Sequence, residues 1–426
     1  MTEIFFHLGK GRTRVEIPER NLLGVHSPPR LETGQAPEEV LRRSVSDPIG
    51  AEPITSSVDE GDNVLIILDD ITRQTPTHLI LPQLASELRS AGVRDQDVEV
   101  LFALGTHRYM TRAEMETKTG ADMLGRFEAV NHYWKDESML QDLGTTGSGI
   151  PITVNRMISE ADWSIGVGNI VPHRVAGYTG GGKIVQPGLG GARTTGLTHM
   201  LSGRFEGEDV LGVAENPVRR EIEEIAERAG LDMIVNTVLD GEANLVAAFS
   251  GDTVEAHRAG VEACDEIYTI PVEHRADIVV VDSHPADLDM WQAVKALEAA
   301  ELAARPGGTI VLLTPCWEGV SSEHPELEEH GYLYPDDAIS MMESGELKDL
   351  VSTAAMVHVG KILEKMRVIV YALGIKRRDV ETLGFEYASS AQEAVDEALK
   401  GSNPSAEVLA FKGAAEIVPR ISGRKS

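Results

Sequence analysis

Residues 63–73 read NVLIILDDITR, and this segment gives the clearest indication of the fold class. After Asn63 the run VLIIL is wholly apolar, without the polar alternation of a strand that has one face in water. Such runs are typical of parallel sheets, whose strands are covered by helices on both faces. The polar segment 69–73 follows at once. Because ligands bind beyond the carboxyl ends of parallel strands, the segment indicates an α/β fold and the edge where a site should lie.

The pattern of apolar strands separated by helices continues along the chain. Further strands are predicted at 98–104, 163–167, 233–238, 277–281, 309–313, 367–371 and 408–411. Helices are predicted up to about residue 90, from about 288, near 341–350 and at 391–399. The first 20 residues alternate around a Gly-Lys-Gly turn and predict a β-hairpin, and residues 26–61 are expected to wrap the surface. Strands that alternate with helices predict parallel sheets flanked by helices.

The length of the chain, 426 residues, exceeds what one hydrophobic core usually holds. We expect two α/β domains, residues 1–270 and 271–426, each a largely parallel sheet flanked by helices, with the active site in the cleft between them. The last segment could pack back on the first domain.

Composition excludes several classes of protein. Hydrophobic residues make up 42% and charged residues 25%, as is ordinary for a globular protein, and no run of about 18 apolar residues predicts a membrane span. The N-terminus has no export signal and the two cysteines cannot form a disulfide framework, so a cytoplasmic protein is expected. The net charge of −29 disfavours nucleic acid and anionic membrane as partners.

Three polar segments follow predicted strands, at 69–73, 105–108 and 168–173, and the last two contain His107 and His173. A single histidine after a strand is more often structural. Three such segments on one rim of a sheet indicate a site more strongly than any one of them.

The segment Gly177–Gly191 (GYTGGGKIVQPGLGG) is the strongest local signal, since seven of its 15 residues are glycine. A phosphate-binding P-loop would need Ser or Thr where Ile184 stands and a helix where Pro187 stands, so that interpretation fails. A flexible loop with a solvated lysine is one alternative. The other is a reactive Lys183 on a loop that lets a bulky anionic cofactor approach the backbone, with His199 as a metal ligand.

In the second half of the chain, Gln292 and Lys295 are spaced i,i+3 and lie on one face of a predicted helix. They could bind a carboxylate across a cleft, or they could be part of an ordinary polar helix face.

Together these motifs resemble the nickel-pincer lactate racemase family over nearly the whole chain. The motifs that carry the resemblance are Asp69-Asp70-x-Thr72-Arg73, Gly105-Thr106-His107, the run from Pro172-His173 to Gly180-Gly181-Gly182-Lys183, His199, and Trp291-Gln292-x-x-Lys295. The resemblance implies a racemase or epimerase that transfers the hydride of a 2-hydroxy acid to a nickel-pincer nucleotide, a pyridinium mononucleotide with a thioamide and a thiocarboxylate. It also implies partner enzymes that synthesise the cofactor.

The resemblance implies a role for each matched residue. Lys183 would carry the cofactor covalently, and His199 would coordinate nickel. His107 and His173 would be the paired acid/base residues, as suits a side chain that titrates near neutrality. The residues expected to bind substrate are Arg73, Trp291, Gln292 and Lys295, and those expected near the cofactor are Asp70, Thr72, Gly180, Gly181 and Gly182.

Two departures bear on the substrate. Trp291 stands where lactate-active members are expected to have tyrosine, and Gly182 stands where alanine is common. Trp291 favours a 2-hydroxy acid other than lactate. The alternative function is a non-redox protein of the same fold that binds a nucleotide-like or acidic ligand.

Overall fold

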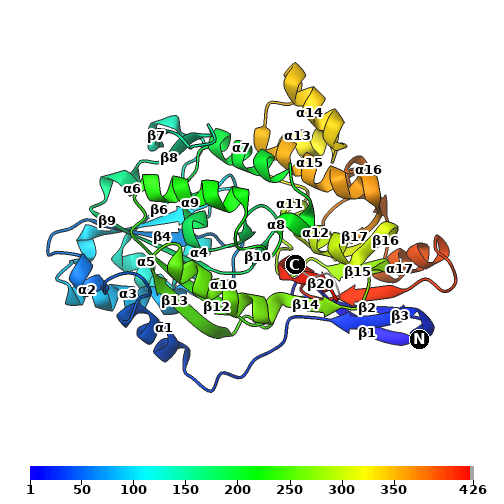
Figure 1. Cartoon of the computed structure of the whole chain (residues 1–426), viewed down its shortest axis with the longest axis horizontal. Helices are drawn as coiled ribbons and strands as arrows, with labels where there is room; N and C mark the ends of the chain where they lie inside the picture. Colours follow the sequence, from blue (N-terminus) through cyan, green and yellow to red (C-terminus); the bar gives the residue numbers. More distant parts are fainter. Residues whose placement is uncertain (423–426) are drawn as a thin grey trace.

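The computed structural model describes residues 1–422 and contains two six-stranded sheets side by side (Figure 1). The first sheet has the order β13-β12-β9-β4-β5-β6, and it is parallel except for the antiparallel pair β12–β13. Its strands are β4 (Val64–Asp69), β5 (Val98–Ala103), β6 (Glu128–Asn131), β9 (Trp163–Asn169), β12 (Met233–Leu239) and β13 (Leu245–Gly251). The predicted fold class, two largely parallel sheets flanked by helices, is confirmed.

Strand β4 is buried at every position because helices cover both faces of its sheet. Ile66 and Leu68 pack in one cluster with Leu84 of helix α3 (Thr77–Ser90). Leu65 and Ile67 point to the other face, where helix α9 (Pro217–Ala229) packs. The uninterrupted apolar run that predicted a parallel strand therefore reflects burial on two sides.

The second sheet has the order β18-β17-β16-β15-β19-β3 and is parallel throughout. Its strands are β3 (Leu22–His26), β15 (Ala276–Asp282), β16 (Ala304–Thr314), β17 (Arg367–Ala372), β18 (Glu386–Tyr387) and β19 (Val408–Phe411). One face packs against helix α12 (Lys295–Ala303) and the other against helix α17 (Ala391–Lys400).

The N-terminal segment lies with the second sheet, which differs from the expected domain of residues 1–270. The predicted hairpin forms as β1 (Thr2–Leu8) and β2 (Gly11–Ile17), and its Phe6 and Val15 pack against the outer face of the second sheet. Strand β3 then pairs in parallel with β19. Sequence pattern alone did not reveal this, because pairing between distant strands is set by tertiary packing rather than by local periodicity.

The end of the chain contacts the first domain. Strand β20 (Val418–Ile421) pairs with β14 (Thr269–Val272), and the guanidinium of Arg420 donates to the carbonyl oxygen of Gly212 at 3.1 Å. The last segment therefore packs back across the junction.

One helix prediction needs correction, and the segment 26–61 contains helices that were not predicted. The segment 341–350, where one helix was expected, holds the end of α14 (Pro335–Ser344) and the start of α15 (Leu350–Lys365). The two helices are separated where Gly345 adopts a positive φ of 80° and Asp349 caps α15. The segment expected to wrap the surface contains helices α1 (Pro37–Ser46) and α2 (Ile54–Ser57).

The remaining elements include several that the sequence pattern did not predict. They are α4 (Arg112–Thr119), α5 (Ala121–Arg126), β7 (Leu140–Thr145), β8 (Pro151–Asn155), α6 (Met157–Glu160), β10 (Pro172–His173), β11 (Gly177–Tyr178), α7 (Ala192–Ser202), α8 (Gly207–Val210), α10 (Glu255–Tyr268), α11 (Met290–Ala293), α13 (Pro325–His330) and α16 (Arg377–Thr382). None of the helices formed by residues 1–422 combines the length and apolar character that a bilayer-crossing helix needs.

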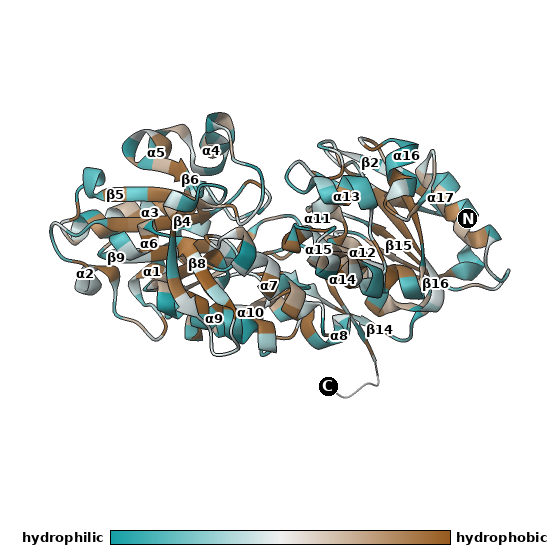
Figure 2. Ribbon diagram, turned by 90° about the horizontal axis from the view of Figure 1, so that it is seen from above, coloured by the Kyte–Doolittle hydropathy of each residue, from teal (hydrophilic) through white to brown (hydrophobic). Residues whose placement is uncertain are grey.

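The two sheets form two lobes, and helices α7, α11, α12 and α15 lie where the lobes meet (Figure 2). Helices α7 and α15 pack closely because Gly196 of α7 has no side chain, and a Cβ atom there would lie 2.4 Å from the Cβ of Leu350. The carboxyl ends of β4, β5 and β9 and the helices of the second lobe therefore border the same space.

Candidate active site

A cavity with about 1200 Å³ of empty space, including its open mouth, lies between the two lobes. The three polar segments that follow strands β4, β5 and β9 meet there, as their shared edge of the sheet predicts. Among the expected site residues, those that line it are Asp70, Arg73, His107, His173, Gly180, Lys183, His199, Trp291, Gln292 and Lys295. Thr72 lies beside an adjoining pocket, and Gly181 and Gly182 line neither space.

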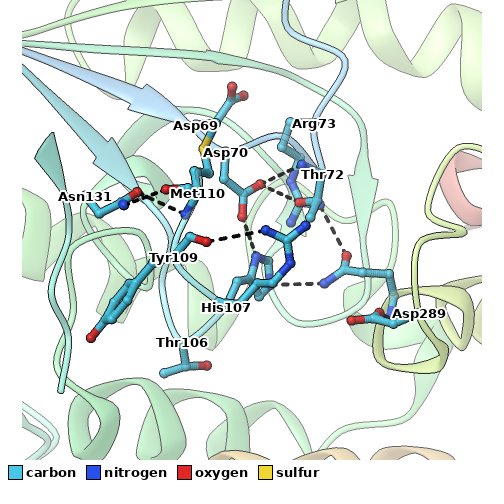
Figure 3. Close-up of polar contacts among 12 residues, drawn as sticks. Asp69, Asp70, Thr72, Arg73, Thr106, His107, Tyr109, Met110, Asn131 and Asp289 are labelled. Atoms are coloured by element: carbon cyan, nitrogen blue, oxygen red, sulfur yellow. Dashed lines mark hydrogen bonds and ion pairs between the residues drawn. The ribbon is translucent and has the colours of Figure 1, made fainter. Parts of the chain in front are cut away.

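Asp70 and His107 are hydrogen-bonded, with 2.5 Å between Oδ2 of Asp70 and Nδ1 of His107 (Figure 3). The hydroxyl group of Thr72 donates to the other oxygen of Asp70 at 2.5 Å. Burial alone would raise the pKa of Asp70, but His107, Arg73 and Thr72 hold it well below its ordinary range. An ionised carboxylate can only accept, so Nδ1 of His107 carries a proton and a neutral ring has its lone pair on Nε2.

Arg73 and Lys295 reach the same amide from opposite lobes. The Oε1 atom of Gln292 accepts from Nζ of Lys295 at 2.5 Å and from Nη1 of Arg73 at 3.5 Å. The amide nitrogen of Gln292 lies 3.0 Å from Nε2 of His107 and donates to it. Asp289 starts the short helix α11 by accepting from the backbone N–H of Gln292 at 2.9 Å. Gln292 therefore holds an oxygen where two cations meet, and a carboxylate oxygen could take that position.

Burial and, next in size, the nearby charge of Arg73 lower the pKa of Lys295 to about 7. A carboxylate bound between the two cations would relieve this repulsion.

The glycine-rich loop is fixed by buried polar side chains, so the flexible-loop interpretation is wrong. Arg219 is fully buried and donates to the carbonyl oxygens of Ala176 at 3.2 Å, of Gly180 at 3.1 Å and of Tyr178. On the other side, Oδ1 of Asn236 accepts from the backbone N–H of Gly181 at 2.8 Å.

These contacts hold Lys183 in a short turn of 3-10 helix that faces the cavity. Burial lowers the pKa of Lys183 well below its ordinary value, and the charges of Arg73 and Lys295 lower it further. Its side chain can therefore be a neutral, nucleophilic amine at physiological pH.

The glycines beside Lys183 are required by protein packing. Gly180 and Gly181 have positive φ values of 78° and 59°, which a side chain would strain. A Cβ atom on Gly180 would lie 2.7 Å from Oδ1 of Asn236, and one on Gly182 would lie 2.8 Å from the Cβ of Ala226. The number of glycines predicted that another group comes close to this backbone. That group is a neighbouring strand or helix of the protein itself.

His173 and His199 are both engaged through Nδ1, but in opposite roles. Nδ1 of His173 accepts from the backbone N–H of Val175 at 3.2 Å, so neutral His173 carries its proton on Nε2. Nδ1 of His199 donates to the carbonyl oxygen of Thr195 at 2.8 Å, which leaves the lone pair of Nε2 free. Burial lowers the pKa of both rings, that of His199 to about 3 with a further contribution from Lys183. A neutral imidazole with a free Nε2 is the form that binds a metal ion.

Within residues 1–422, no group of three or more His, Cys, Asp or Glu side chains is placed to hold a metal ion. A metal at His199 would therefore take most of its ligands from a non-protein group. A neutral lysine, one free imidazole nitrogen and a large cavity fit an organic cofactor that brings its own metal ligands.

Sequence reasoning missed His324, which shapes the mouth of the site. Its ring stacks on Trp291 with 4.2 Å between centroids, and its Nδ1 lies 2.6 Å from Oδ2 of Asp349. The other ring nitrogen lies 3.3 Å from the hydroxyl of Thr106, so His324 joins the two lobes. It also missed Asn236, Glu298 and His358, which line the cavity. These residues stand in ordinary strand, helix or loop sequence, and no local motif distinguishes them.

The fold and the cavity define a two-domain α/β enzyme whose site lies between its domains. The chain belongs to the lactate racemase family, since the Lactate racemase N-terminal domain matches residues 8–208 and the Lactate racemase C-terminal domain matches residues 272–418. It is accordingly an isomerase of the racemase type.

Two curated lactate racemases are similar to the chain. The protein from Thermoanaerobacterium thermosaccharolyticum is 30% identical over 328 residues, which cover 76% of each chain. The protein from Lactiplantibacillus plantarum is 32% identical over 290 residues, which cover 67% of this chain and 68% of the relative.

Solved structures extend the likeness to nearly the whole chain. The structure of the lactate racemase apoprotein from Thermoanaerobacterium thermosaccharolyticum has a TM-score of 0.85 and 26% identity, covering 98% of this chain and 100% of that one. A protein from Thermotoga maritima, with a TM-score of 0.74, 20% identity and coverage of 92% and 100%, shares the fold.

Proposed function

We propose that this protein is a nickel-pincer-dependent racemase or epimerase of a 2-hydroxy acid. The observation that carries the proposal is the convergence of Arg73 and Lys295 on the Gln292 amide, next to His107. A carboxylate that displaces this amide oxygen would gain two charge-assisted hydrogen bonds. Its adjacent carbinol hydroxyl would then lie within reach of the histidine.

The cofactor assignment depends on Lys183 and His199. The neutral amine of Lys183 can form the covalent link, and the free Nε2 atom of His199 can complete the coordination of nickel. When bound, the nickel-pincer nucleotide would supply an acceptor for the hydride of the carbinol carbon. Gly180, Gly181 and Gly182 act by shaping the loop that holds Lys183.

His107 and His173 are the acid/base pair in this proposal. Their neutral rings offer different groups, a lone pair on Nε2 of His107 and a proton on Nε2 of His173. In one enantiomer the substrate hydroxyl can donate to Nε2 of His107. In the other, the substrate oxygen can accept a hydrogen bond from Nε2 of His173. Asp70 and Thr72 act as positioning residues, because they fix the tautomer of His107.

The substrate is a 2-hydroxy acid, and lactate is the one that the names of the relatives state. Trp291 stacks on His324 and lines the cavity, where it bounds the space beside the carboxylate group. The racemase would work in the cytoplasm beside the enzymes that synthesise its cofactor.

The test is co-expression with those enzymes, followed by measurement of nickel content, of the mass of the peptide that contains Lys183, and of racemisation. We expect nickel, an adduct on Lys183 and racemisation of an enantiopure 2-hydroxy acid. His199→Ala should lower nickel content. A nickel-loaded preparation that converts no 2-hydroxy acid would overturn the proposal.

A further inference from the structure

One wall of the cavity carries polar side chains for which the racemisation chemistry gives no role. Glu298 lies on helix α12, one turn after Lys295 and on the same face. His358 lies on helix α15, and Arg174 follows His173 in the chain. Glu298, His358 and Arg174 all line the cavity, and each is buried, with 8%, 6% and 4% of its surface exposed. Buried polar groups at this depth need partners.

Glu298 and His358 are placed so that one oxygen atom could hydrogen-bond to both of them. The Nε2 atom of His358 donates to the carbonyl oxygen of His199 at 3.3 Å, so its Nδ1 atom is an acceptor. This Nδ1 atom lies 3.9 Å from Oε1 of Glu298, which is too far for a direct hydrogen bond. An oxygen about 2.8 Å from both atoms would lie about 2 Å to one side of the line that joins them, and would bridge them from the cavity.

Beside Glu298, a neutral hydroxyl is favoured over a second carboxylate. Glu298 would repel an anion. The Nη2 atom of Arg174 is engaged with the carbonyl oxygen of Phe205 at 3.1 Å, and its Nη1 atom is buried without a partner among residues 1–422. Burial raises the pKa of Glu298 to about 7, against the charges of Arg174 and Lys295. Its carboxyl group can therefore donate to a hydroxyl as well as accept from one.

The same wall leaves room for a longer side chain. Val351, Ala354 and Ala355 of α15 line this part of the cavity with small groups. A substrate with only a methyl group beyond the carbinol carbon would leave Glu298 and His358 without partners, which costs binding free energy.

We propose that Glu298 and His358 form a second polar subsite, and that the substrate carries at least one further hydroxyl group beyond its carbinol carbon. The inference rests on the proposed function, which it deepens by naming the substrate class. Glu298 is thereby the residue that determines specificity, and it takes no part in hydride or proton transfer.

The experiment compares nickel-loaded enzyme on lactate, glycerate and threonate, which carry no, one and two further hydroxyl groups. We expect kcat/KM for threonate to exceed that for lactate by at least about tenfold. Glu298→Leu should lower the threonate value by about 10- to 100-fold and leave the lactate value within about threefold. If Glu298→Leu does not fold, Ala355→Leu takes its place in the test. It fills the adjoining space and should also shift the preference from threonate toward lactate.

Glu301→Gln is the matched control, because Glu301 is buried on the same helix, pairs with Lys365 and does not line the cavity. It should change neither value. The inference is overturned if the parent enzyme prefers lactate, if Glu298→Leu lowers both values equally, or if that variant loses nickel, which would place Glu298 at the cofactor. Racemisation of lactate alone leaves the proposed function intact. A loaded enzyme that converts none of the three acids overturns both.

Discussion

The carboxylate of Asp70 accepts the Nδ1 proton of His107 across 2.5 Å, and this contact decides which nitrogen of His107 faces the cavity. Because Nδ1 is occupied, Nε2 carries the lone pair, which accepts from the Gln292 amide at 3.0 Å and could accept from a substrate hydroxyl in its place. The contact joins the ends of β4 and β5, two neighbouring strands of one sheet. The register of these strands therefore determines which ring nitrogen of His107, the proposed base, carries the proton.

Asp70→Asn should lower kcat by about 10²–10⁴-fold, because asparagine can stabilise the wrong tautomer and cannot stabilise a charged imidazole. Nickel content should stay at the parent level, and the acid limb of the pH–rate profile should shift to lower pH, since a protonated imidazole at position 107 would lose its counter-ion and become less stable. Nickel content and a kcat profile from pH 5 to 9 check this. An unshifted profile would mean that Asp70 supports only the fold.

Arg73→Lys should raise KM and lower kcat, because lysine cannot make the planar two-pronged contact of a guanidinium with a carboxylate. A combined loss of about 10²-fold in kcat/KM is expected. Steady-state kinetics on holoenzyme measures both constants. Arg42→Lys, at an exposed site on α1, is the control and should behave as the parent. A rise in KM without any loss of kcat would show that Arg73 binds the acid without orienting it.

Lys295 should make substrate binding pH-dependent. Its pKa is lowered to about 7, so the ammonium group loses its proton as the pH rises through that value and attracts a carboxylate less. KM should therefore rise above about pH 7, by up to about tenfold per pH unit. Lys295→Arg keeps its charge and should abolish the rise. A KM that is flat from pH 6 to 9 in the parent enzyme would contradict this role.

Arg219→Met should destabilise the protein, because three loop carbonyls would lose a buried charged donor. Each buried group left unpaired costs about 1–3 kcal/mol. Thermal unfolding of the apoprotein should show a clear fall in Tm, and the Lys183 loop should exchange its amide hydrogens faster. Arg220→Met, next along α9, is the control. An unchanged Tm would mean that other contacts suffice to hold the loop.

The sequence predicted the parts of this fold that local patterns encode. Apolar runs such as 64–68 identify buried strands, because burial on both faces removes polar alternation. The motifs at strand ends identified Asp70, Arg73, His107 and His173 of the cavity, because parallel strands bring their carboxyl ends together. The helix pattern near 341–350 failed because Gly345 and the cap at Asp349 interrupt continuous apolar spacing.

Features set by distant contacts could not be predicted. The pairing of β3 with β19 joins segments almost 400 residues apart, and nothing in either strand specifies its partner. Glu298 and His358 are spaced as in any helix, and only the packing of α12 and α15 around the cavity brings them together. Glycines 180–182 were predicted to need close approach, but the neighbour that requires it is the protein itself.

The central claim is that this chain racemises a 2-hydroxy acid with a cofactor tethered to Lys183. Its most direct test is peptide mass mapping of holoenzyme alongside a racemisation assay of the same preparation and of Lys183→Ala. We expect one adduct, on the peptide that contains Lys183, and activity that is lost in the variant even with excess nickel. An adduct on another residue, or a Lys183→Ala enzyme that racemises at the parent rate, would contradict the account.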